Sequence, residues 1–431
     1  MPQTCRFVGV PWPSRYHGPL VPELDLDFVR AWFPALSGRW ALFDNAGGSV
    51  TSQAVIAGIV EYLERYQVQL GASYGLSEQA EARVRRGELT AAELLGAAPE
   101  ETVVGPSTTA NLATLARALA PLMSPGDEVI VTDLDHESNI GPWRGLAEHG
   151  MKVLTWAVDR ERATLGLAEL ERLLSPRTRL VAFTHCANVV GELLDARAIV
   201  ERIRGNRADT WVVVDGVAFA PHRFVDVAEL DVDAYALSLY KVYGPHLGAM
   251  FVRRGLLERA AGQNHFFVPA DALPAKLQPG GVTHELAAGL PGIGAYLDGV
   301  AEHHGIQGAT RRDRWRQVFD LFAAHEERLS ARLLDFLVEH PRCRVIGPAV
   351  PDRTRRAPTI AFVVDGMRSS EVVPPLDDRH VATRWGHFYA KRAIDALGLA
   401  SHDGIVRVSM VHYNTLAEVD RLVDALDDAL G

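Results

Sequence analysis

The sequence predicts an α/β fold, with a mostly parallel sheet in a large domain and a smaller α+β C-terminal domain. Three observations support this prediction. Short apolar runs alternate with helical stretches from residue 101 to 254, residues 285–340 have a mostly helical pattern, and strands and helices mix again from 359 onward. Strands that alternate with helices form βαβ units, and the parallel sheets built from such units are buried on both faces.

The individual elements follow from hydrophobic periodicity. Apolar runs in the first part of the chain predict strands at 101–105, 127–133, 152–158, 179–185, 210–216, 235–240 and 248–254. The patterns between them predict helices at 110–122, 141–150, 167–174 and 195–205. The second part predicts a long helix at about 310–339, strands at 359–366 and 405–413, and helices at 390–398 and 415–430. Thr415 and Glu418 have the spacing of a capping box, which marks the start of the last helix.

The length of 431 residues allows two or three domains. We expect residues 31–290 to form the large α/β domain and residues 291–431 the small α+β domain. Residues 1–30 are expected to form an N-terminal segment that packs on the small domain.

Composition excludes several classes of function. With 44 basic and 54 acidic residues the net charge is −10, whereas binders of nucleic acid or anionic membranes are normally basic. No apolar run is long enough for a membrane span, and the N-terminus lacks the pattern of a signal peptide. The three cysteines, Cys5, Cys186 and Cys343, are widely spaced and form no zinc motif, which is typical of free thiols in a reducing compartment. We therefore expect a cytoplasmic protein without a metal site, a nucleic-acid partner or a membrane partner.

Common catalytic motifs are absent from the sequence. It contains no GxxxxGK[ST], GxGxxG or HExxH pattern. Ser238 and Lys241 match the S-x-x-K motif of penicillin-binding enzymes, but the Ser-Asp-Asn and Lys-Thr-Gly motifs that accompany it are missing. The serine also ends a predicted strand instead of opening a helix, so a serine hydrolase is disfavoured.

Polar residues follow the predicted strands, at the sheet edge where parallel α/β folds bind ligands. These residues are Ser107, Thr108, His136, Asn139, Asn188, Asp215 and Lys241. Each has an ordinary structural explanation when taken alone, such as a helix N-cap for the hydroxyls. Together they match the needs of pyridoxal 5′-phosphate (PLP): a lysine for the Schiff base, an aspartate for the pyridine nitrogen and a phosphate site at a helix start.

Longer motifs carry a family resemblance across nearly the whole chain. They are FDNAGG (43–48), GPSTTANL (105–112), DHESNIGPW (135–143), THCANVVGELL (184–194), VVDGVAFAPH (213–222), SLYKVYGPHLGAMF (238–251), LQPGGVTHE (277–285) and RVSMVHYNT (407–415). In these motifs the sequence resembles the class V aminotransferases of PLP fold type I, and within them the cysteine desulfurase-like branch. The resemblance implies fold type I, a PLP cofactor, an amino-acid substrate and a homodimer with active sites at the interface.

The resemblance also implies roles for residues that contact the cofactor. Lys241 would form the internal aldimine and shuttle the proton at Cα, Asp215 would pair with the pyridine nitrogen, and His136 would stack on the ring. Asn188 would contact the phenolic oxygen. Ser107, Thr108 and Ser238 would bind phosphate. Tyr240 stands where desulfurases have a histidine, and Ala218 where they have a glutamine. Gly281 and Thr283 lie in the loop that would reach the phosphate of the neighbouring subunit.

On the substrate side, Arg407 would clamp the α-carboxylate with its bidentate guanidinium. Ala46, Gly47, Asn139 and Arg384 complete the predicted substrate contacts.

One segment departs from the family pattern. Members that form a persulfide carry a cysteine late in an R-x-G-x-x-C segment, whereas this chain has Tyr389 at that position. Cys186 is predicted to be a packed thiol without a catalytic role. We therefore expect a lyase that eliminates a β-group, by C–S or C–Se cleavage or by desulfination, without the usual persulfide cysteine.

Other reactions of the same cofactor remain open at this point. They are amino-group transfer or epimerisation by a class V transferase, and carbon–carbon bond formation, since a fungal decarboxylative aldolase of this branch shares the VDGVA and VHYNT motifs. A non-enzymatic PLP-binding protein is disfavoured because Lys241, Asp215 and Arg407 are all present.

Overall fold

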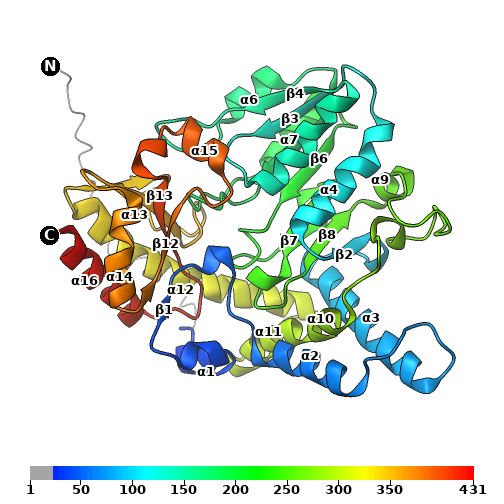
Figure 1. Ribbon diagram of the computed structural model, residues 1–431, viewed down its shortest axis with the longest axis horizontal. Coiled ribbons are helices and arrows are strands. Elements are labelled where there is room, and N and C mark those ends of the chain that lie inside the picture. Colours follow the sequence, from blue (N-terminus) through cyan, green and yellow to red (C-terminus); the bar gives the residue numbers. More distant parts are fainter. Residues whose placement is uncertain (1–22) are drawn as a thin grey trace.

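The large domain is centred on a seven-stranded sheet in the computed structural model, which describes residues 23–431 (Figure 1). In spatial order the strands are β2 (Thr102–Gly105), β8 (Gly248–Val252), β7 (Ala234–Ser238), β6 (Trp211–Asp215), β5 (Thr178–Thr184), β3 (Glu128–Thr132) and β4 (Lys152–Trp156). The pairings from β7 to β4 are parallel, and β8 runs antiparallel to both of its neighbours. The prediction of a mostly parallel sheet is confirmed.

Both faces of this sheet are buried, because successive side chains of each strand enter different cores. On β6, Val212 and Val214 belong to one hydrophobic cluster, whereas Trp211 and Val213 belong to the other. Helices cover each face. Between residues 53 and 303 the helices are α2 (Gln53–Arg65), α3 (Gly75–Leu95), α4 (Thr108–Leu119), α5 (Gly141–Arg144), α6 (Leu167–Leu173), α7 (Ala196–Asn206), α8 (Val227–Leu230), α9 (Arg254–Arg259), α10 (His284–Gly289) and α11 (Pro291–His303).

Two parts of the large domain differ from the sequence prediction. Residues 141–150 form the short α5 and then a 3₁₀ turn at Gly145–His149, because three glycines in ten residues weaken a helix. The sequence analysis assigns no element to residues 53–95, where the structure has α2 and α3. Gly87 on α3 packs directly against the backbone of Ala287 on α10, which leaves no room for a larger side chain.

The small domain contains a four-stranded antiparallel sheet. Its spatial order is β12 (Arg384–Gly386), β13 (Ile405–Ser409), β10 (Thr359–Val364) and β9 (Cys343–Ile346). The helices of this domain are α12 (Arg311–Glu339), α13 (Ser369–Val372), α14 (Pro374–Asp378), α15 (Lys391–Ala396) and α16 (Leu416–Leu430). The predicted capping box of Thr415 and Glu418 at the start of α16 is confirmed.

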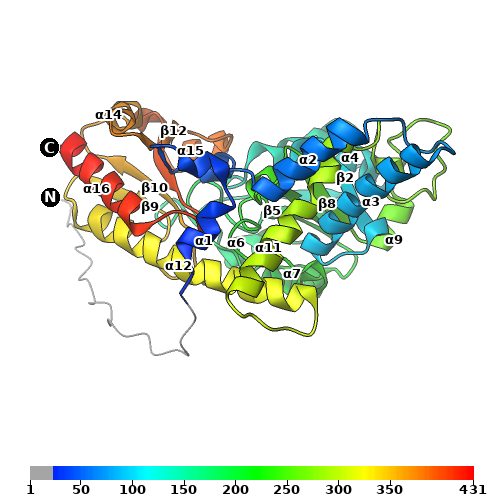
Figure 2. The ribbon, with the colours of Figure 1, turned by 90° about the horizontal axis from the view of Figure 1, so that it is seen from below.

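Helix α12 belongs to both domains (Figure 2). In its N-terminal half Phe319 packs against Phe224 of the large domain, with ring centres 6.4 Å apart, and its C-terminal half contributes Leu329 and Leu333 to the core of the small domain. With 29 residues it is roughly 43 Å long at about 1.5 Å per residue.

The chain before the large sheet also contacts the small domain. Helix α1 (Leu26–Ala31) carries Arg30, which pairs with Glu418 at 3.1 Å and donates to the Tyr413 carbonyl. Strand β1 (Ala41–Leu42) pairs in parallel with β11 (Val381–Ala382). The predicted packing of residues 1–22 lies outside the described residues, and the limits 31–290 and 291–431 stay predictions. No helix within residues 23–431 is long and apolar enough to cross a membrane.

Candidate active site

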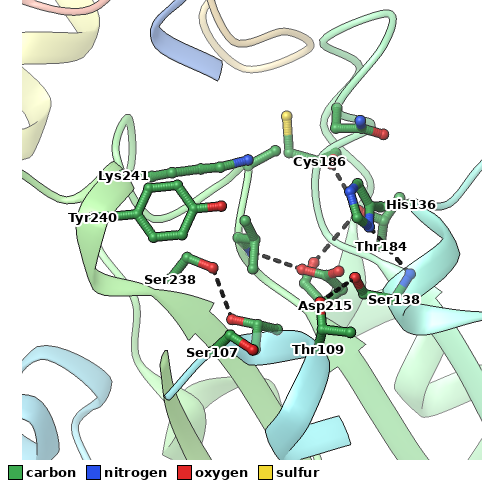
Figure 3. Close-up of a pocket in the computed structure, with 14 residues that line it drawn as sticks. Ser107, Thr109, His136, Ser138, Thr184, Cys186, Asp215, Ser238, Tyr240 and Lys241 are labelled. Carbon is green, nitrogen blue, oxygen red and sulfur yellow. Dashed lines mark hydrogen bonds between the residues drawn. The ribbon is translucent and has the colours of Figure 1, made fainter. Parts of the chain in front are cut away.

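A pocket lies at the carboxyl ends of the central strands, next to the N-terminus of α4 (Figure 3). The structure brings eight of the predicted residues together in its wall: Ser107, Thr108, His136, Asn188, Asp215, Ser238, Tyr240 and Lys241. Thr109 also lines the pocket, together with Ser138 and Thr184, two residues that were not predicted. Figure 3 shows hydroxyl side chains at one end of the pocket and Lys241 at the other.

The hydroxyl end is built from the start of α4 and the end of β7. Ser107 is the N-cap of α4, and its Oγ accepts a hydrogen bond from the Ala110 amide at 3.1 Å. Thr108 Oγ1 donates to the Leu237 carbonyl at 2.9 Å, so the 2.8 Å contact between Thr108 and Ser238 leaves Ser238 as the donor. The amides at a helix start favour anions. This end of the pocket therefore suits a phosphate group.

Lys241 and Asp215 lie at the carboxyl ends of the neighbouring strands β7 and β6. Lys241 ends the 3₁₀ turn Leu239–Lys241 after β7, and Asp215 is the last residue of β6. Burial and the charge of Arg407 lower the pKa of Lys241 to about 8. Burial raises the pKa of Asp215 to about 6, although a hydrogen bond from the Val217 amide at 2.8 Å opposes this shift. A lysine amine that loses its proton near neutral pH can act as a nucleophile and as a base.

His136 presents a neutral ring to the pocket. Its Nδ1 accepts a hydrogen bond from the Ser138 amide at 3.1 Å, so the proton of the neutral ring is on Nε2. Burial, together with the charges of Lys241 and Arg407, lowers the pKa of His136 to about 4. The ring is therefore uncharged at neutral pH and can stack on a flat ligand.

The turn that carries His136 is fixed by a buried hydrogen-bond network. Asp135 accepts from the Thr132 hydroxyl, from Asn139 Nδ2 at 2.8 Å and from the Thr184 amide at 3.2 Å. Asn139 Oδ1 accepts from the Trp143 indole at 3.1 Å. Both polar atoms of Asn139 thus serve this network, and the structure does not bring the side chain to the pocket as the sequence analysis expected.

Arg407 lies behind the pocket on β13 and is only 2% exposed. It pairs with Asp44 at 2.8 Å, donates to the Asn188 carbonyl at 3.2 Å and lies 3.8 Å from the centre of the Phe388 ring. Arg384 reaches the other oxygen of Asp44 at 3.3 Å and is exposed. Asp44 is a site residue that the sequence analysis missed, although it stands in the FDNAGG motif.

The remaining predicted residues lie outside this pocket. Gly47 and Arg384 line a second hollow together with Asp44 and Tyr240. The amide of Ala46 donates to Ser409 Oγ at 2.8 Å. Gly281 and Thr283 are exposed to solvent and do not reach the pocket of their own chain.

The cysteines of the described residues are poorly placed for nucleophilic chemistry. Cys186 lines the pocket, but burial raises the pKa of its thiol to about 12. Cys343 opens β9 in the small-domain sheet, and burial raises the pKa of its thiol to about 11. The reactive form of cysteine is the thiolate, and both side chains stay protonated at neutral pH. Cys5 lies outside the described residues.

The sequence matches the family model for aminotransferase class-V at residues 41–271 and 309–422. The aminotransferase-like protein FGM3 of Gibberella zeae is 38% identical over 95% of this chain and 99% of its own length. The cysteine desulfurase-like protein ustD of Aspergillus flavus is 32% identical over 95% of this chain and 92% of its own. The crystal structure of the cysteine desulfurase CsdA of Escherichia coli superposes with a TM-score of 0.79 and 26% identity, over 94% of this chain and 98% of that one.

The family match covers most of the chain, and the relatives align over nearly their full length. The fold is that of the PLP enzymes of fold type I. The chain therefore belongs to the class V aminotransferase family, whose members are enzymes that use pyridoxal 5′-phosphate.

Proposed function

We propose that the chain acts on an amino acid through Lys241 and eliminates a β-substituent, as a C–S or C–Se lyase or a desulfinase. The observation that carries the proposal is the convergence of Lys241, Asp215 and His136 on one pocket with a hydroxyl-lined end. These three residues support removal of the proton from the substrate Cα. We choose elimination over sulfur transfer because Tyr389 occupies the position of the persulfide cysteine.

The residues of the pocket fit PLP. The start of α4 offers the Ser107 hydroxyl and backbone amides for the phosphate, and the buried carboxylate of Asp215 is a partner for the pyridine nitrogen. His136 offers its neutral face to the ring. Asn188 Nδ2 donates one hydrogen to the Phe388 carbonyl at 3.0 Å, and its second hydrogen would serve as the donor to the phenolic oxygen.

When bound, PLP supplies an electron sink that stabilises negative charge at the substrate Cα. Lys241 would hold the cofactor and, once freed by the substrate, its Nζ would remove the Cα proton. Its lowered pKa of about 8 leaves part of the amine unprotonated at neutral pH. Arg407 would bind the α-carboxylate with two parallel hydrogen bonds and so set which Cα bond faces Lys241.

Direct elimination is favoured over sulfur transfer to a thiol. Tyr389 occupies the position of the persulfide cysteine, and Cys186 is buried with a raised pKa of about 12. Tyr389 has no thiol to accept sulfur, and the buried thiol of Cys186 stays protonated at neutral pH. The β-group would therefore leave to solvent as sulfide, selenide or sulfite instead of remaining on the enzyme.

The proposal includes a homodimer in a cytoplasmic setting. Gly281 and Thr283 are exposed and do not line the active-site pocket of their own chain, which supports a role toward the phosphate of a neighbouring subunit. The net charge of −10 supports the absence of nucleic-acid and membrane partners.

Two experiments test the proposed function. The purified protein should be yellow, and Lys241→Ala should abolish the visible band. The holoenzyme is then incubated with cysteine, cysteine sulfinate, selenocysteine or alanine, while sulfide, sulfite, selenide and keto acid are measured. We expect release of the β-group without an amino acceptor, and the same release from Cys186→Ala.

Three outcomes would contradict the proposal. A colourless protein that yields no cofactor by mass spectrometry would remove its basis. Keto acid formed only in the presence of an amino acceptor would indicate amino-group transfer. Carbon–carbon coupling to an added aldehyde, without β-group release, would indicate a bond-forming enzyme.

A further inference from the structure

A short strap, residues 387–389, crosses from the small domain to the pocket of the large domain. It follows β12 and precedes α15. Phe388 and Tyr389 both have left-handed backbones, with φ of 48° and 58°. This conformation is unfavourable for residues with a side chain, so two in succession persist only where surrounding contacts impose them.

The contacts that impose it come from the walls of the pocket. Asn188 Nδ2 donates to the Phe388 carbonyl at 3.0 Å, and the Glu137 amide donates to the Tyr389 carbonyl at 2.8 Å. Arg392, just beyond the strap, pairs with both oxygens of Glu137 at 2.9 and 3.1 Å. The loops that carry Asn188 and His136 therefore fix the strap on the pocket.

This backbone sends the two aromatic side chains to different places. Phe388 is buried against the Arg407 guanidinium. Tyr389 lies beside His136, with ring centres 5.3 Å apart and planes 35° from parallel, yet it remains 67% exposed. Strained backbone thus holds a large aromatic ring that is still two-thirds exposed to solvent. Such a ring is suited to covering a ligand, because it does not fill a core.

We propose that Tyr389 determines which β-substituent the site accepts. Its exposed ring lies beside His136, which lines the pocket, and its phenol donates a hydrogen bond to a polar group on Cβ of the bound substrate. The preferred substrates are amino acids with a hydrogen-bond acceptor on Cβ, such as a sulfinate, thiolate or selenolate, over alanine. This inference rests on the proposed function and adds a residue that reads the side chain.

Binding by holoenzyme variants tests the hydrogen bond. Cysteine sulfinate, cysteine and alanine are titrated separately into the wild type, Tyr389→Phe and Tyr389→Ala, with the shift of the visible band as readout. We expect Tyr389→Phe to weaken cysteine sulfinate about fivefold to tenfold, the value of one hydrogen bond, and to leave alanine unchanged. The matched control is Trp385→Phe on β12, an aromatic residue that is 42% exposed, which should change neither ligand.

A chemical readout tests the position without activity. In Tyr389→Cys, bound alanine, which has no β-group to transfer to the new thiol, should slow alkylation of position 389 by iodoacetamide, as measured by mass spectrometry of the labelled peptide. In Trp385→Cys the same ligand should leave labelling of position 385 unchanged.

Equal weakening of alanine and cysteine sulfinate in Tyr389→Phe would overturn the inference, as would the absence of protection at position 389. Either result leaves the proposed function intact. A yellow enzyme whose spectrum responds to no amino acid would instead refute the proposed function.

Discussion

Replacing Asp44 with asparagine removes the carboxylate that neutralises a buried arginine and preserves the shape of the side chain. Arg407 is 2% exposed, and its contact with Asp44 measures 2.8 Å. Asparagine can still accept one hydrogen bond, but it leaves the guanidinium charge without a counter-charge. We therefore expect Asp44→Asn to lower the free energy of unfolding.

The size of the loss follows from the burial of the two partners. Removing one partner of a fully buried ion pair costs about 3–5 kcal/mol. The side chain of Asp44 is 24% exposed, and Arg407 keeps its contacts with the Phe388 ring and the Asn188 carbonyl, so we expect about 2–3 kcal/mol. The loss of the exposed contact between Asp44 and Arg384 adds only about 0–1 kcal/mol to this decrease in the free energy of unfolding.

The same reasoning predicts how a substrate changes the loss. The α-carboxylate of an amino acid bound at Arg407 would supply the missing charge, so saturating alanine should stabilise Asp44→Asn more than the wild type. The assay is urea unfolding of the holoenzyme with and without alanine. Asp428→Asn is the control, because it removes an exposed pair with Arg379 and should cost little.

Two results would refute this reasoning. If Asp44→Asn were as stable as the wild type, the buried charge of Arg407 would not depend on Asp44. If alanine stabilised both proteins equally, the substrate carboxylate would not share the site of the Asp44 carboxylate.

Three further predictions concern the cofactor and the fold. The rate at which the apoenzyme takes up added PLP should rise with pH and level off above the Lys241 pKa of about 8, because only the unprotonated amine attacks the aldehyde. Asp215→Asn removes a charge that raises this pKa, so the plateau should move to lower pH. A rate that does not depend on pH would contradict both predictions. In Gly248→Ala the new Cβ would lie 2.5 Å from the backbone at the start of α4, so we expect about 1–3 kcal/mol of destabilisation and weaker cofactor retention in dialysis, whereas Gly255→Ala, with nothing within 4 Å, should behave as wild type. Thr415→Ala removes the N-cap of α16 and should cost about 1 kcal/mol in urea unfolding without changing the visible spectrum; an unchanged midpoint would count against the cap.

The sequence could predict the residues that converge at the sheet edge, because parallel strands bring their carboxyl ends together. Lys241, Asp215 and His136 each follow a buried strand, so their meeting required only the correct sheet. The position of a residue at a strand end does not predict where its side chain points. Asn139 has the right position, but the buried indole of Trp143 and the carboxylate of Asp135 need both of its polar atoms.

Contacts between distant segments were beyond the sequence analysis. Asp44 and Arg407 are separated by 363 positions, and no local pattern pairs them. The two-residue strands β1 and β11 are too short to show any periodicity. The left-handed backbone of Phe388 and Tyr389 is also invisible in the sequence, because neither residue favours it and the large domain imposes it.

The helix α12 couples the folding stability of the two domains, because it packs against both. A fragment of residues 291–431 would retain the whole helix but would expose Phe319 and Glu326 to water, since their partners Phe224 and His222 belong to the large domain. The large domain alone would lose the same contacts and open its own core. We therefore expect the chain to melt as one cooperative unit rather than domain by domain.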